Sequence, residues 1–164
     1  MNVIYLRLFI AAIITLALTI LPLPELLTGL RPPWVLMLVL YLQFFLPGYF
    51  NVVILLIIGL ILDVLLATVL GEHAFALSVV TWIASNKERR FNFFSMGQQM
   101  ALIGFFCLLY QMLIMMMELV LGYHISFLMC VGSAAISMIL WPWVRLLADD
   151  TLQVRAVYSR KLSR

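Results

Sequence analysis

Long apolar runs separated by short polar links fill most of this sequence. The runs cover residues 3–23, 33–46, 51–70, 74–85, 98–121 and 125–147. A helix that crosses a bilayer needs ~20 apolar residues. Apolar residues make up 66% of the 164 residues and charged residues only 10%, against about 45–50% and 25% in soluble domains. The pattern predicts an all-α polytopic membrane helix bundle with six transmembrane helices.

Two of these runs, 33–46 and 74–85, are short for a membrane span. A helix of about 14 residues reaches only ~21 Å, whereas the hydrocarbon core is ~30 Å thick. These helices must borrow flanking residues, thin the bilayer locally or lie inside the bundle. If one of them does not cross, the chain has five spans.

The basic residues predict the orientation of the bundle. With six spans, nine of the ten Lys and Arg residues fall on one side, and only Arg31 falls on the other. Because cytoplasmic segments carry the excess of Lys and Arg, both termini are predicted to be cytoplasmic. Trp141 and Trp143 are expected to anchor the last helix at that interface.

The same pattern divides the chain into a transmembrane domain, 1–147, and a basic cytoplasmic tail, 148–164. Four basic residues in this tail could bind anionic lipid, could bind a protein, or could serve only to set the topology. The outer links, of about eight, three and three residues, are too short to hold a soluble domain.

Catalytic and metal-binding motifs are missing from the sequence. There is no metalloprotease motif and no phosphate-binding loop, and the two cysteines, Cys107 and Cys130, lie inside apolar runs without metal spacing. His73 and His124 give only a weak zinc signal. We therefore expect no enzyme activity, no cofactor and no nucleic-acid partner.

A carboxyl group inside an apolar span is a functional hypothesis by default, and here Asp63 and Glu118 both fall toward the outer ends of their helices. Arg31 and Trp34 open the second helix on the same side, so these four residues form a candidate polar cluster. Arg31 could pair with Asp63 or with Glu118 and fix helix packing or hold a partner. Alternatively, the charges are solvated at the interface and Asp63 meets water or a helix-end donor, or the cluster binds a ligand or a proton.

Two glycines are candidates for close packing between helices. Gly59 lies one turn before Asp63, and Gly71 follows the third run. Small residues let the backbones of membrane helices approach closely.

The order of several short motifs resembles the MreD family of rod shape-determining proteins. Arg31-Pro32-Pro33-Trp34 matches an Arg-Pro-x-Trp stretch that opens the second helix, and Gly59 to Asp63 matches a Gly-x-x-x-Asp step in the third. Tyr41, Asn51, Leu70-Gly71 and Leu140-Trp141-Pro142-Trp143 add to the resemblance. Their order and spacing agree along nearly the whole chain, although residues 74–121 offer no comparable motif.

The resemblance implies a non-enzymatic scaffold of the cell-elongation complex in the bacterial inner membrane, which helps to control cell shape and peptidoglycan synthesis. Its implied partners are MreC and, directly or through MreC, the glycosyltransferase RodA, its transpeptidase and MreB filaments. Helix faces, including the Arg31–Asp63 region, would hold the single helix of MreC or a second copy of this chain.

The family's fold is also similar to the six-helix substrate-binding subunits of energy-coupling-factor vitamin transporters. That similarity implies an alternative function as a small-molecule-binding membrane subunit. Asp63, Arg31 and Glu118 would then surround an outer-leaflet pocket.

Overall fold

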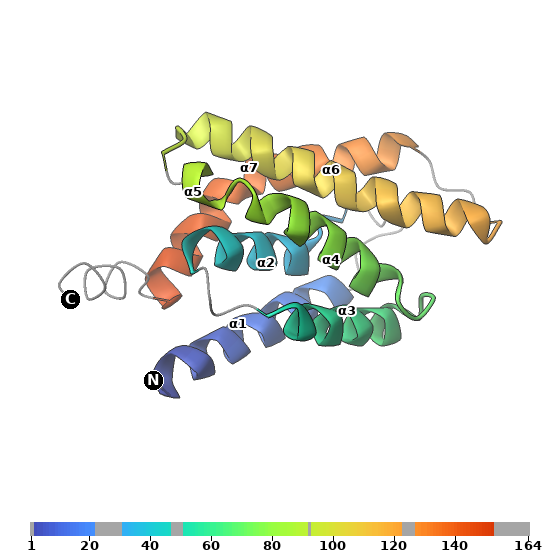
Figure 1. Ribbon diagram of the computed structural model, residues 1–164, viewed down its shortest axis with the longest axis horizontal. Helices are drawn as coiled ribbons and strands as arrows, with labels where there is room; N and C mark the ends of the chain where they lie inside the picture. Colours follow the sequence, from blue (N-terminus) through green and yellow to red (C-terminus); the bar gives the residue numbers. More distant parts are fainter. Residues whose placement is uncertain (1, 22–30, 47–50, 92, 123–126, 153–164) are drawn as a thin grey trace.

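The computed structural model describes residues 2–21, 31–46, 51–91, 93–122 and 127–152, and these residues are helical apart from short connections. Six helices lie in three layers of two, with α6 and α7 above α2 and α4, and with α1 and α3 below (Figure 1). A seventh, α5, is a single turn. The helices are α1 (Asn2–Ile20), α2 (Trp34–Phe45), α3 (Val52–Leu66), α4 (Glu72–Ser85), α5 (Glu88–Phe91), α6 (Met96–Val120) and α7 (Phe127–Leu152).

The short helix α2 forms the centre of the bundle. Nine of its twelve residues are buried, on all sides of the helix, and it contacts α1, α4, α6 and α7. An apolar helix with no polar face is typical of a fully enclosed position. This burial agrees with the explanation in which the short run 33–46 lies inside the bundle.

Helix α3, by contrast, presents only one stripe to the core. Its buried residues are Leu55, Gly59, Leu62 and Asp63, which recur at the three- to four-residue spacing of one helix face. The helix ends at Leu66 rather than at the expected Leu70, because Ala67 adopts a left-handed backbone conformation with φ 52°. The chain then turns back into α4 through Gly71, whose φ is 99°.

Helices α6 and α7 form a long antiparallel pair and are both long and apolar enough to cross a membrane. Helix α6 begins at a cap in which the Ser95 N–H donates to Gln98 Oε1 at 3.0 Å. Helix α7 contains Pro142 and bends toward α2 in its last turns (Figure 1). A proline inside a helix removes one backbone hydrogen bond and commonly causes such a bend. The helix continues beyond the expected Leu147 to Leu152.

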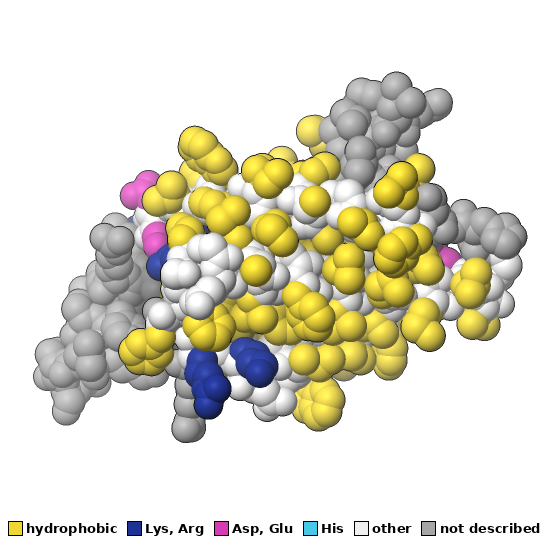
Figure 2. Space-filling model, turned by 90° about the horizontal axis from the view of Figure 1, so that it is seen from above, with side chains coloured by type: hydrophobic (Ala, Val, Ile, Leu, Met, Phe, Trp, Pro, Cys, Tyr) yellow, Lys and Arg dark blue, Asp and Glu magenta, His cyan; other side chains and the backbone are white. Residues whose placement is uncertain are grey.

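Large apolar side chains cover the outside of the bundle. Val64 is 68% exposed, Trp82 72% and Leu128 77%. Figure 2 shows one face on which hydrophobic side chains fill the middle and the visible charged side chains lie toward the ends. Soluble monomers rarely expose apolar surface on this scale. The exterior is therefore suited to lipid.

The two ends of the bundle differ in the charges they carry. The start of α1, the end of α7 and α5 lie at the same end of the bundle, on the left of Figure 1. We call this the Arg145 end, and its described residues also include Arg7, Lys87 and Arg90. Arg31 lies at the opposite end, where α2 begins, and we call this the Arg31 end.

Candidate functional site

A pocket of about 340 Å³ lies at the Arg31 end. It is lined by the C-terminal parts of α1, α3 and α6 and by the starts of α2, α4 and α7. Three of the four residues of the predicted polar cluster, Arg31, Trp34 and Glu118, contribute to its wall together with His73. Asp63 does not line the pocket but binds His73, which does. The predicted cluster is thus brought to one place in the fold.

The fully buried Asp63 carboxyl group caps the start of α4. Its Oδ2 accepts the Gly71 N–H at 2.7 Å and its Oδ1 accepts the His73 N–H at 2.8 Å. The His73 Nδ1 also lies 3.0 Å from Oδ1. The first N–H groups of a helix have no partner within the helix, and a negative group is favoured at that end. Asp63 therefore joins the end of α3 to the start of α4.

Arg31 is held mainly through its backbone. Its carbonyl oxygen accepts a hydrogen bond from the Ser133 hydroxyl of α7 at 2.5 Å, and Gln111 of α6 donates to the same hydroxyl at 2.9 Å. The guanidinium Nη1 donates to the Thr19 carbonyl at 3.4 Å. Its Nε is buried and has no hydrogen-bond partner among the described residues.

Two carboxyl oxygens near this pocket are also unpaired. Glu118 Oε2 and Glu72 Oε1 are buried without a hydrogen-bond partner in the described part of the chain. Glu118 lines the pocket, whereas Glu72 lies in the first turn of α4.

These contacts correct the expected pairing of charges. Within the described ranges Asp63 pairs with His73 and with helix-end N–H groups, and neither it nor Glu118 forms an ion pair with Arg31. Of the alternative interpretation, the structure confirms that Asp63 meets helix-end donors. It does not show the charges as solvated, because Arg31 Nε and Glu118 Oε2 are buried.

The two candidate close-packing glycines have different roles. A Cβ on Gly59 would lie 2.2 Å from Ala74 Cα, so α3 and α4 touch backbone to backbone there. A Cβ on Gly71 would meet nothing within 4 Å. Gly71 is required for its positive φ of 99° and not for close packing, because side chains other than glycine rarely adopt that conformation.

The two tryptophans of α7 differ in their exposure. Trp143 is 68% exposed and can serve as the expected interfacial anchor, whereas Trp141 is fully buried. Its ring packs against Tyr41 and Phe91, with centroids 6.5 and 6.1 Å apart. Two residues along a helix are about 200° apart, so the pair cannot face one interface. The prediction that Trp141 is an interfacial anchor was therefore wrong.

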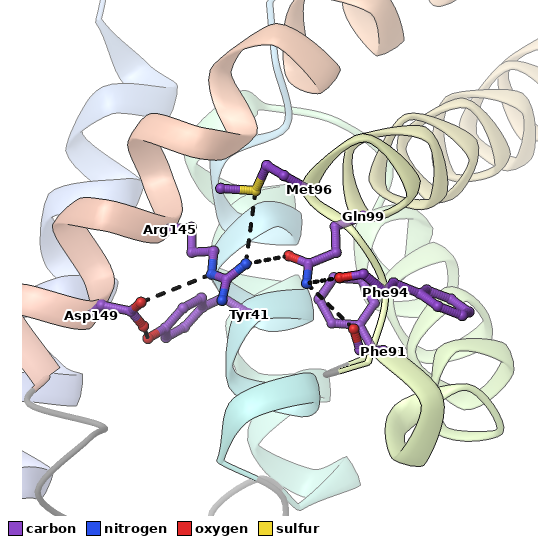
Figure 3. Close-up of polar contacts among 7 residues, drawn as sticks. All are labelled: Tyr41, Phe91, Phe94, Met96, Gln99, Arg145 and Asp149. Carbon is purple, nitrogen blue, oxygen red and sulfur yellow. Dashed lines mark hydrogen bonds and ion pairs between the residues drawn. The ribbon is translucent and has the colours of Figure 1, made fainter.

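A second polar cluster, which was not predicted from the sequence, lies at the Arg145 end (Figure 3). The Tyr41 hydroxyl of α2 donates to Asp149 Oδ1 of α7 at 2.5 Å. Arg145 Nε lies 3.9 Å from the other oxygen of Asp149, and its Nη1 donates to Gln99 Oε1 at 2.7 Å. Its guanidinium also lies 5.1 Å from the centre of the Phe45 ring. This network fastens the bent end of α7 to α2 and α6.

Gln99 extends that network to the segment before α6. Its Nε2 donates to the carbonyl oxygens of Phe94 and Phe91 at 3.1 and 3.4 Å. Phe91 in turn stacks on Phe44 of α2, with ring centroids 3.8 Å apart. The segment between α5 and α6 is thereby tied to the core.

An apolar groove of about 360 Å³ separates α1 from α3. Ala12 and Thr15 lie on its α1 side, Ile57 and Ile61 on its α3 side, and α2 forms its floor with residues such as Val39. Thr15 is its one polar lining residue, and its hydroxyl donates to the backbone of α1. The groove therefore offers an apolar surface with small residues on one wall.

The fold is an all-helical bundle, and its apolar exterior is suited to a membrane. The model of the family described as rod shape-determining protein MreD matches residues 2–150. The rod shape-determining protein MreD of Haemophilus influenzae is 28% identical over 135 residues, which cover 82% of this chain and 83% of that protein. The chain belongs to the MreD family, whose members are membrane proteins that determine cell shape and are not enzymes.

No solved structure matches the chain. The similarity to energy-coupling-factor subunits therefore stays a prediction, and the alternative function drawn from it gains no support.

Proposed function

We propose that this chain is a scaffold of the bacterial cell-elongation complex that binds the membrane helix of MreC. It crosses the inner membrane six times with both termini in the cytoplasm. Contacts with RodA, its transpeptidase and MreB run through MreC, and through these contacts the chain helps to control peptidoglycan synthesis. Membership of a shape-determining family supports the cellular role.

The distribution of charge supports the orientation. Arg7, Lys87, Arg90 and Arg145 belong to the same end of the bundle as the start of α1 and the end of α7, and Arg31 belongs to the other. An excess of basic residues is typical of the cytoplasmic side. The basic tail proposed to bind anionic lipid lies mostly outside the described residues.

The observation that carries the MreC proposal is the groove between α1 and α3. Apolar helices gain little from leaving lipid, so they associate where small residues and complementary shape permit close packing. The stretch from Leu8 to Leu16 lines this groove and corresponds to about 12 Å of helix, or about two turns of a helix lying alongside it. Its apolar lining matches the apolar side chains of a single spanning helix.

The test is to fill the groove and measure capture of MreC. Ala12→Phe would place a ring in the groove, whereas Ala17→Phe makes the same change at an exposed position of α1 outside it. We expect Ala12→Phe to reduce the MreC that copurifies with the full chain at least fivefold and Ala17→Phe to leave it unchanged. Equal capture by both variants, each present in the membrane at wild-type level, would reject the groove as the MreC site.

A second copy of this chain could compete for the same groove. The mass of the purified complex distinguishes the two occupants. We expect MreC to be lost from the Ala12→Phe complex. Loss of a second copy with MreC retained would assign the groove to a homodimer and contradict the proposal.

A further inference from the structure

The pocket at the Arg31 end contains an unpaired donor and an unpaired acceptor. Arg31 Nε and Glu118 Oε2 are both buried, and neither has a hydrogen-bond partner among the described residues. Arg31 lies in the segment just before α2 and Glu118 in the last turn of α6, and both residues line the same cavity. Because buried polar atoms in folded proteins are nearly always hydrogen-bonded, a molecule that occupies the cavity has to offer both an acceptor and a donor.

The other walls of the pocket fit an amphiphile. Its volume of about 340 Å³ lies within the range of about 300–1,000 Å³ for small-molecule sites. Trp34 and Tyr110 contribute aromatic rings, and Leu62 and Ile114 contribute apolar surface. Thr19, at the end of α1, and Met129, at the start of α7, also line it, so the pocket lies at the Arg31 end of the bundle, where several helices begin or end.

We propose that this pocket binds the headgroup of a zwitterionic aminophospholipid. The Arg31 guanidinium would donate to the phosphate, for which its planar fork of N–H groups is well suited. The primary ammonium group would donate to Glu118 Oε2, because an ammonium carries three N–H donors. Trp34 would lie beside the same cation, as aromatic rings do in ammonium-binding sites.

The same chemistry excludes two other common headgroups as the preferred ligand. A phosphocholine headgroup carries a quaternary ammonium without an N–H, so it cannot donate to Glu118. A phosphoglycerol headgroup carries the phosphate and hydroxyl donors but no cation, so its hydrogen bond to Glu118 lacks the charge assistance that an ammonium provides. The preferred ligand therefore has both a phosphate and a primary amine.

The test compares lipid retention by the purified full chain. The protein is exchanged into micelles containing equal amounts of phosphatidylethanolamine, phosphatidylcholine and phosphatidylglycerol of one acyl composition, and bound lipid is measured by native mass spectrometry. We expect phosphatidylethanolamine to be retained about tenfold over each of the others, since one charge-assisted hydrogen bond corresponds to roughly that ratio. Equal retention of the three lipids would overturn the proposal.

Variants of the lining residues test whether the preference for phosphatidylethanolamine arises in this pocket. Glu118→Gln should abolish the preference for phosphatidylethanolamine, because Glu118 is the group that meets the primary amine. Arg31→Gln should lower the retention of all three lipids, because each of them carries the phosphate, and Arg31→Lys, which keeps the charge and removes Nε, should give an intermediate retention. Lys87→Gln, at an exposed position of the other end, should change neither the preference nor the retention. An unchanged preference in Glu118→Gln, or an unchanged retention in Arg31→Gln, would overturn the site.

A soluble zwitterion could satisfy the same two side chains. Free phosphoethanolamine is therefore added at increasing concentration to the lipid-bound protein. We expect no displacement at concentrations equal to that of the lipid, because the acyl chains contribute to binding. Displacement at equal concentration would contradict the lipid assignment. The outcome is independent of MreC, so failure of this proposal leaves the scaffold proposal unaffected, and the reverse holds as well.

Discussion

Gly59 of α3 and Ala74 of α4 lie backbone to backbone, because a Cβ built on Gly59 would fall 2.2 Å from Ala74 Cα. Even the smallest side chain has no room at this position. We expect Gly59→Ala to lower the free energy of unfolding in micelles by roughly 1–3 kcal/mol, the usual range for overpacked contacts. Gly97→Ala is the control, since a Cβ there meets nothing within 4 Å. An equally stable Gly59→Ala protein would show that α3 and α4 can separate at little cost.

The cap formed by Asp63 makes a second prediction. Asp63→Leu removes the acceptor for the N–H groups of Gly71 and His73, and each buried donor left unpaired costs about 1–3 kcal/mol. Hydrogen exchange of the His73 amide should therefore accelerate strongly, and Asp63→Asn, which keeps one acceptor oxygen, should have a smaller effect. Asp150→Asn, at an exposed position, serves as the control. Unchanged protection of the His73 amide in Asp63→Leu would contradict the cap.

How far the sequence alone predicts these features depends on the distance over which each one acts. The apolar runs anticipated the six main helices, because an apolar run between polar links is a local feature of the sequence. The early end of α3 was missed because it depends on the left-handed conformation of Ala67, which no residue type at that position signals. The cap on α4 could have been predicted from the sequence. Asp63 lies in the last turn of α3, and only a short turn separates that helix from the start of α4.

The sequence alone does not predict contacts between helices that are far apart in the chain. Tyr41 and Asp149 are 108 residues apart, and their contact depends on the course of α7 after Pro142. The Arg31 end shows the opposite case. Arg31, Trp34 and Glu118 were expected in one cluster because all three lie near helix ends on the same side, and they line one pocket. The hydrogen-bond partners of Arg31 could not be predicted, because they come from α1 and α7.

The Tyr41–Asp149 hydrogen bond predicts coupling between α2 and α7. Tyr41→Phe and Asp149→Ala should each destabilise the protein, and the double variant should lose about 1 kcal/mol less than the sum, because the bond can be lost only once. The coupling is measured by chemical unfolding in micelles. Replacing Asp149→Ala by Asp150→Ala in the cycle should remove the coupling. Additivity of Tyr41→Phe and Asp149→Ala within about 0.3–0.5 kcal/mol would mean that the two side chains do not interact.

The proposed six-span topology predicts which ends of the helices can be labelled from outside the cell. Val120→Cys, at an 87% exposed position at the end of α6, should react with a membrane-impermeant maleimide in intact spheroplasts. Lys87→Cys should react only after the membrane is opened. The native Cys107 and Cys130 are buried and should contribute little background. Labelling of both variants from the same side would require a different number or orientation of spans.

The central claim is that the groove between α1 and α3 holds the helix of MreC, and photo-crosslinking in the membrane tests it most directly. A photoreactive amino acid at Ile57 would face the groove, whereas the same residue at the neighbouring exposed Leu56 would not. We expect a crosslink to MreC from position 57 and little or none from position 56. A crosslink from position 56 alone, or from neither position while MreC still copurifies, would contradict it.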